Sequence, residues 1–122
     1  PGTVEALADG VALLTGAGIA IHPRGGGMSY TDAFLPQSAR SAVIDTGRLN
    51  RITQIDADGL WVTVETGVTW AELDAALAPH GVRTPFWGPF SGHAATVGGS
   101  LSQGTATFGS GRVGSSGNAV LG

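Results

Sequence analysis

The 122-residue chain has no cysteine and few charged side chains, and both shortages exclude classes of function. Without cysteine the chain forms no disulfide and has no thiolate nucleophile or cysteine metal ligand. Charged residues make up 12% of the chain, its six basic residues are scattered, and the net charge is −3. We therefore expect no surface for nucleic acid or for an anionic membrane.

Long apolar runs and targeting signals are also missing from the sequence. No apolar run approaches the roughly 18 residues of a membrane span, and the N-terminus lacks the basic region and apolar core of a signal peptide. These absences favour the cytoplasm. Hydrophobic residues still reach 42%, which is the composition of a folded chain of at most one ordinary domain.

Glycine is the residue in excess, with 21 copies, and three of them stand together at Gly25–Gly27. Ordering glycine carries a high entropic cost, which is offset when several backbone N–H groups approach one anion. The run therefore predicts a phosphate-binding loop, in which Arg24, Ser29 and Tyr30 offer further contacts. A flexible surface turn is the alternative. The spacing matches neither a Walker loop nor a Rossmann fingerprint.

The first third of the chain has one helical pattern and two strand patterns. Apolar residues recur at helical spacing over residues 4–14, with Thr3 as the expected N-cap. Residues 19–21 and 42–45 read as strands, and the first of them leads directly into the glycine loop. Here a helix precedes the strand and the glycine loop follows it. In a nucleotide P-loop protein the loop is instead followed directly by a helix.

A hairpin and a second helix are predicted next. Residues 51–56 and 60–65 flank Asp58-Gly59, which is a strong turn signal. Alternation in the second strand predicts one buried face, formed by Leu60, Val62 and Val64. Thr69 and Glu72 have the spacing of a capping box, which predicts a helix ending near residues 79–81. Two tryptophans are expected in the core or at its rim: Trp61 and Trp70.

Regular periodicity fades from Thr84 onward. The stretch Thr96-Val97-Gly98-Gly99, followed by small residues, is compatible with a helix that starts against an anion or a ring system. On residue patterns alone, this second glycine-rich segment indicates a site without defining its ligand.

Four segments of the chain together resemble one known family: Arg24–Tyr30, Glu65–Trp70, Ala95–Gly99 and Arg112–Gly122. Their order and spacing are similar to the PCMH-type FAD-binding domain of the vanillyl-alcohol oxidase / p-cresol methylhydroxylase family of FAD-linked oxidoreductases. The resemblance implies an α+β fold, with a first α/β subdomain at residues 1–83 and the start of a second at 84–122. It also implies a truncated domain and an absent C-terminal substrate domain, so we expect a fragment.

The resemblance carries cofactor contacts over to both glycine-rich segments. The residues implied to wrap the FAD pyrophosphate, chiefly through backbone N–H groups, are Arg24, Gly25, Gly26, Gly27, Met28 and Ser29, with Tyr30 closing the motif. The residues implied to line the flavin and ribityl or phosphate region are Pro85, Ser91, Thr96, Gly98, Gly99, Ser102 and Gly104, with Val120 near the cofactor. We expect Gly26→Val to abolish flavin retention, because valine does not readily take positive φ and would block the anion.

Two departures from the family pattern bear on the cofactor. Some relatives attach the flavin covalently through a histidine in the loop, and this chain has Met28 at that position and no cysteine for a second link. The implied FAD is therefore non-covalent. Val113 stands where a tyrosine is usual in the family, and an acidic residue often found near Asn118 is absent.

The resemblance implies an FAD-dependent oxidoreductase that takes a hydride from a small organic substrate. No catalytic residue is assigned, because the substrate-side acids and bases of the family lie mainly in the later domain. A catalytically inactive flavin- or nucleotide-binding module, or a truncated gene product, is the alternative. A related flavin reductase of cell-wall sugar metabolism is disfavoured by Ser29-Tyr30.

The histidines give no further site. His22, His80 and His93 are too far apart for a ligand spacing, so no metal is expected. For His93 a hydrogen-bonded loop residue is favoured over a catalytic base.

Overall fold

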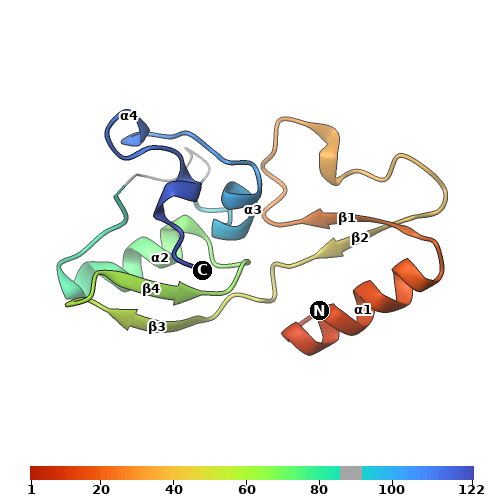
Figure 1. Cartoon of the computed structure of the whole chain (residues 1–122), viewed down its shortest axis with the longest axis horizontal. Helices are drawn as coiled ribbons and strands as arrows, with labels where there is room; N and C mark the ends of the chain where they lie inside the picture. The colour runs from red at the N-terminus through yellow and green to blue at the C-terminus, as the bar shows by residue number, and fades with distance from the viewer. Residues whose placement is uncertain (86–91) are drawn as a thin grey trace.

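A computed structural model describes residues 1–85 and 92–122 and shows an elongated molecule with two small sheets (Figure 1). At one end α1 (Val4–Gly16) lies beside the parallel pair β1 (Ala20–Arg24) and β2 (Ser41–Asp45). At the other end the antiparallel pair β3 (Ile52–Asp56) and β4 (Trp61–Val64) lies beside α2 (Trp70–Leu77). The short helix α3 (Val97–Ser102) lies between the two ends. The predicted α+β class is confirmed.

The first helix begins where the sequence predicts. The Thr3 side chain accepts a hydrogen bond from the backbone N–H of Ala6 over 3.1 Å, which satisfies one of the free donors of the first turn. The apolar stripe of α1 is only half-buried, at Leu7 and Leu14, while Val4 stays 57% exposed. The helix therefore covers the first sheet without entering the main core.

The first sheet leads directly into the glycine loop. In the parallel pair Ala20 lies opposite Ser41 and Arg24 lies opposite Asp45, and the chain leaves β1 at Arg24 directly into the glycines. The long connection from β1 to β2 contains a 3₁₀ turn at Asp32–Phe34. This connection places Phe34 beside Arg24, with the guanidinium carbon 6.0 Å from the ring centroid.

The predicted hairpin is present, and its turn corrects one expectation. β3 and β4 pair from Ile52 opposite Val64 to Asp56 opposite Trp61, with a register shift between Ile52 and Gln54. Leu60 has φ 57° and is 77% exposed, so it belongs to the turn and not to the buried face predicted for it. The reversal of the chain takes a left-handed residue at Leu60, so β4 begins one position later than predicted.

The second helix is fixed by its predicted capping box. Thr69 Oγ1 accepts from the backbone N–H of Glu72 over 3.2 Å, and the Glu72 carboxylate accepts from the backbone N–H of Thr69 over 2.8 Å. A 3₁₀ turn at Ala78–His80 follows α2, and it ends the helical segment where the sequence predicts.

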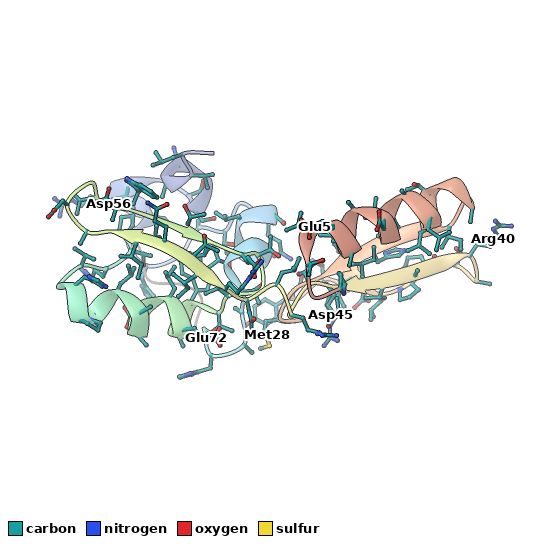
Figure 2. All side chains as sticks on the ribbon, turned by 90° about the horizontal axis from the view of Figure 1, so that it is seen from below. Glu5, Met28, Arg40, Asp45, Asp56 and Glu72 are labelled. Atoms are coloured by element: carbon teal, nitrogen blue, oxygen red, sulfur yellow. The ribbon has the colours of Figure 1, made fainter. Side chains whose placement is uncertain are left out.

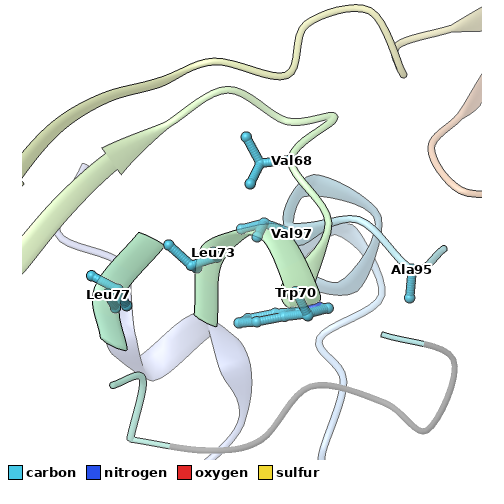
Figure 3. Packing of buried hydrophobic residues seen from close by; sticks show 6 residues of the cluster. All are labelled: Val68, Trp70, Leu73, Leu77, Ala95 and Val97. Atoms are coloured by element: carbon cyan, nitrogen blue, oxygen red, sulfur yellow. The ribbon is translucent and has the colours of Figure 1, made fainter. Parts of the chain in front are cut away.

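The main core forms around α2 (Figure 3). Trp70, Leu73 and Leu77 follow one another along the helix and are at most 7% exposed. They form one cluster with three residues of the flanking segments: Val68, Ala95 and Val97. Burial of such a side chain contributes about 1.5–3 kcal/mol, so this cluster is the main source of stability for the hairpin end.

Hydrogen bonds connect the second glycine-rich segment to the residues between β4 and α2. The backbone N–H of Val97 donates to the carbonyl of Val68 over 2.8 Å, and that of Gly98 donates to Thr66 over 3.0 Å. A β-carbon on Gly98 would come within 2.6 Å of Thr66, so glycine permits this close approach. The chain then continues through α4 (Ser110–Val113) and a 3₁₀ turn at Ser116–Ala119.

Candidate functional site

The two glycine-rich segments meet backbone to backbone. A β-carbon on Gly26 would overlap the carbonyl oxygen of Ala94, and one on Gly25 would overlap Oγ1 of Thr96. Thr96 is 4% exposed and is the N-cap of α3, where its Oγ1 accepts from Gly99 N–H over 3.2 Å. The glycines at 25 and 26 are therefore required by contact between two parts of this chain.

This contact corrects the reason predicted for glycine at position 26. Gly26 is not among the residues with positive φ, and within the loop that conformation belongs to Gly27, at φ 68°. A β-carbon on Gly27 would lie 2.9 Å from the guanidinium of Arg24, so the arginine side chain folds over this turn of the loop. Valine at position 26 would be excluded by the Ala94 carbonyl and not by its own φ.

The two segments together line a cavity of about 980 Å³. Ligand pockets commonly measure about 300–1,000 Å³, so this one is large enough for an extended ligand. Met28 lies near the middle of the molecule in Figure 2, with Arg40 at one end and Asp56 towards the other. The predicted site residues that line the cavity are Arg24, Gly25, Gly26, Gly27, Met28, Ser29, Tyr30, Thr96, Gly98, Gly99 and Ser102.

Three predicted site residues do not line this cavity, and a fourth lies outside the described residues. Pro85 and Val120 line a second, largely apolar cavity of about 530 Å³, bounded by β4, α2 and the C-terminal residues. Gly104 lines neither cavity; it has φ 59° and follows α3. Ser91 lies outside the described residues.

The cavity also has lining residues that sequence reasoning missed. Phe34 comes from the 3₁₀ turn after the loop, and Thr46 from the end of β2. Others follow α3 along the chain: Gln103, Thr105, Ala106, Thr107 and Phe108. The sequence could have indicated Gln103, because it stands between the predicted site residues Ser102 and Gly104.

The loop that lines the cavity has a run of backbone N–H groups without an acceptor in the described chain. Within residues 1–85 and 92–122, the backbone N–H groups of residues 25–29 have no hydrogen-bond acceptor. Gly25, Gly26, Gly27 and Ser29 are half-buried. Consecutive backbone N–H groups without an internal acceptor, in residues that line a cavity, are the kind of feature that binds an anion.

Arg24 supplies the positive charge at this end of the cavity. Its Nη1 lies 3.4 Å from Oδ2 of Asp45, and both side chains are about half exposed, at 46% and 53%. The guanidinium is thus held between Asp45, the Phe34 ring and the turn at Gly27. A surface ion pair at this exposure contributes little energy, so it orients the arginine without neutralising it.

A stronger ion pair lies outside the cavity, at the base of the hairpin. The Arg51 side chain donates to Oε1 of Glu65 from both Nε, over 3.0 Å, and Nη2, over 2.7 Å, and its backbone N–H donates to Oε2 over 2.8 Å. The side-chain hydrogen bonds from Arg51 lower the pKa of the Glu65 carboxyl below its usual range. The same hydrogen bonds raise the pKa of Arg51.

The histidines form no metal site in the part of the chain that is described. His22 Nδ1 lies 3.2 Å from the carbonyl oxygen of Ala33, so this side chain fastens the connection after the loop. His80 ends the 3₁₀ turn after α2, and His93 is exposed. No described helix is long and apolar enough to cross a membrane.

The whole chain, residues 1–122, matches the family model described as "FAD binding domain". The chain belongs to this family of FAD-binding domains. The predicted family and the predicted cofactor, FAD, are thereby confirmed. Glycine backbone at the wall of a large cavity, with a row of free N–H donors beside it, fits the diphosphate of that cofactor.

Curated relatives of this FAD-binding domain include dehydrogenases and an oxidase. The chain is 34% identical over 99 residues to the D-2-hydroxyglutarate dehydrogenase of Pseudomonas putida, covering 75% of this chain and 9% of that protein. It is 30% identical over 105 residues to the L-gulonolactone oxidase of Bos taurus, covering 86% of this chain and 23% of that protein. The chain thus spans less than a quarter of these relatives.

The fold also recurs in solved structures. An alkyldihydroxyacetonephosphate synthase superposes with a TM-score of 0.87 at 25% identity, over 99% of this chain and 22% of that chain. The names of the relatives therefore include dehydrogenases, an oxidase and a synthase, so the domain itself does not fix the class of reaction.

Proposed function

We propose that the cavity between the two glycine-rich segments is the FAD site of this domain. The loop at residues 25–29 would hold the pyrophosphate through its backbone N–H groups, with the Arg24 guanidinium beside it. The observation that carries this proposal is the row of N–H groups without an acceptor in the described chain, at the wall of a cavity of about 980 Å³. Several charge-assisted hydrogen bonds, at about 1.5–3 kcal/mol each, would hold the pyrophosphate against the loop.

The second segment would contact the remaining length of the cofactor. Thr96, Gly98, Gly99 and Ser102 line the same cavity as the loop. The resemblance assigns them to the flavin and ribityl region, and we keep that assignment as part of the proposal. Pro85 and Val120 line the other cavity, so a role for them at the cofactor has no support from their positions. Ser91 and Gly104 stay predictions.

We propose that the cofactor is bound without a covalent link from this domain. The residue in the loop position used for attachment in some relatives is Met28, whose thioether does not form such a bond, and the chain has no cysteine. Met28 is 45% exposed and lines the cavity, so it would contact the cofactor by packing.

The complete protein is proposed to be an FAD-linked oxidase or dehydrogenase of a small organic substrate. Bound FAD supplies hydride acceptance, and the domain supplies its position and electrostatic surroundings. The named relatives at 30% identity or more are dehydrogenases and an oxidase, which favours an oxidoreductase over an inactive binding module. We propose that substrate binds to a further domain of the complete protein. We also propose that residues 1–83 form a first subdomain and residues 84–122 the start of a second.

A visible absorption spectrum tests the proposal. The protein is purified with whatever native sequence flanks these residues, and the spectrum is repeated on the supernatant after acid precipitation. We expect a flavin band that moves entirely into the supernatant. A protein that is colourless and takes up no added FAD would overturn the site, and a flavin band that stays with the precipitate would overturn the non-covalent assignment.

A further inference from the structure

One hydrogen bond joins the two glycine-rich segments through their side chains. Nε2 of Gln103 donates to Oγ of Ser29 over 2.7 Å, across 74 residues of sequence. Gln103 is the C-cap residue of α3, and Ser29 is the last residue of the loop at 25–29. Both residues line the cavity of about 980 Å³. The bond therefore lies at the wall of the proposed FAD site.

The Ser29 hydroxyl has two further contacts, both with Thr31. The backbone N–H of Thr31 donates to Ser29 Oγ over 3.2 Å, and the two hydroxyl oxygens lie 3.0 Å apart. A serine hydroxyl has two lone pairs and one proton to donate. Gln103 and the Thr31 N–H occupy both lone pairs, because each of these groups is a donor only. The only hydrogen bond that Ser29 Oγ can still make is one donated by its own O–H.

This accounting fixes the polarity of the hydroxyl. Because Ser29 has no lone pair left to accept with, its O–H is inferred to be the donor to the Thr31 hydroxyl oxygen 3.0 Å away. A phosphate oxygen is an acceptor and is matched only by a donor. Without Gln103 one lone pair would be free, and the hydroxyl could turn away from the ligand to accept from another group or from water.

We infer that Gln103 is a positioning residue for the FAD site, which acts by holding the Ser29 hydroxyl as a donor towards a phosphate of the cofactor. The inference rests on the proposed function of the cavity. On binding, the Ser29 O–H would exchange its hydrogen bond to the Thr31 oxygen for one to a phosphate oxygen, with the proton staying on Ser29 and both lone pairs still occupied. Gln103 itself needs no contact with the cofactor.

A double-mutant cycle tests this indirect action. FAD is titrated, by quenching of flavin fluorescence, into apoprotein of the wild type, Gln103→Leu, Ser29→Ala and the double variant, each with its native flanking sequence. Gln103→Leu is expected to weaken FAD binding about tenfold, the loss of roughly one hydrogen bond to a charged group. In the Ser29→Ala background the same substitution is expected to change the affinity less than twofold.

Matched controls separate positioning from a general effect on the fold. Gln37 is exposed, donates to the Leu35 carbonyl over 3.3 Å and lies outside the cavity, so Gln37→Leu removes a comparable bond elsewhere and should leave FAD affinity unchanged. Thermal unfolding of the apoprotein variants should shift alike for Gln103→Leu and Gln37→Leu. A riboflavin titration, which offers no phosphate, should show no loss from Gln103→Leu.

Each other outcome overturns a defined claim. Equal loss from Gln103→Leu with and without Ser29 would show that Gln103 acts on the cofactor independently. No loss in the wild-type background would show that Gln103 has no positioning role, while leaving the FAD site intact. Failure of the wild type itself to bind FAD would overturn the proposed function and this inference with it.

Discussion

A β-carbon at Gly26 would overlap the carbonyl oxygen of Ala94, so the two glycine-rich segments meet at this point without space for any side chain. The contact makes glycine at position 26 a requirement of the apoprotein itself, whether or not a ligand is bound. The loop is therefore positioned before a cofactor arrives, which lowers the ordering cost of binding.

Gly26→Ala is expected to destabilise the apoprotein by about 1–3 kcal/mol, the range for overpacking a filled site. Thermal unfolding without added FAD measures this directly. Gly10→Ala is the matched control, because Gly10 lies inside α1 and a β-carbon there would have no neighbour within 4 Å. That variant should gain about 0.5–1 kcal/mol. An unchanged unfolding temperature for Gly26→Ala would contradict the close contact.

Arg24→Ala is expected to weaken FAD binding about three- to tenfold without abolishing it, because the backbone donors of the loop are intact and an exposed charge contributes modestly. A titration of the apoprotein with FAD gives the ratio of Kd values. Arg83→Ala removes the same charge from a residue that does not line this cavity, and it should have no effect. Complete loss of binding in Arg24→Ala would place the main phosphate contact on the side chain.

Acid should weaken the hairpin through Glu65. The folded-state pKa of Glu65 is lowered by its hydrogen bonds from Arg51, so its stabilisation is present above the unfolded-state pKa of about 4.3 and is lost as the pH falls through the folded value. Chemical unfolding between about pH 5 and pH 3 should show a steeper loss of stability for the wild type than for Glu65→Gln. Identical slopes for the wild type and Glu65→Gln would contradict the assignment.

Leu60→Gly is expected to stabilise the protein by about 0.5–1 kcal/mol. A left-handed conformation costs a non-glycine residue about 1–2 kcal/mol, and the greater entropy of unfolded glycine offsets part of the gain. Leu60 is 77% exposed, so little packing is lost. Leu60→Ala keeps the β-carbon and its strain and should not share the gain. Equal stability of the glycine and alanine variants would argue against strain at this turn.

These residues also show what the sequence can and cannot predict. Thr3 and the Thr69–Glu72 box were predictable because a cap involves residues three apart. The exposure of Leu60 was not, because a difference of one position in the turn removes it from the strand face. The contacts of Gly26 with Ala94 and of Ser29 with Gln103 join positions about 70 residues apart, and no local pattern reports such a pair.

The glycine loop illustrates the same limit at the candidate site. The sequence attributes all three glycines to a ligand, whereas the structure assigns two of them to packing against the second segment and the third to a left-handed turn. The resemblance nevertheless identified the right family, because the order of four short motifs carries information that no single motif has. Cavity residues such as Phe34 and Ala106 lie outside those motifs and needed the fold to be found.

The most direct test fills the cavity. Ala106 is exposed and lines it, while Ala75 is exposed on α2 and lines neither cavity, so tryptophan at each position makes a matched pair. FAD is titrated into apoprotein of Ala106→Trp, Ala75→Trp and the wild type. The account predicts at least about a tenfold weaker Kd for Ala106→Trp, roughly 1.4 kcal/mol, and an unchanged Kd for Ala75→Trp. Equal, undiminished affinity in all three would contradict the placement of FAD between the two glycine-rich segments.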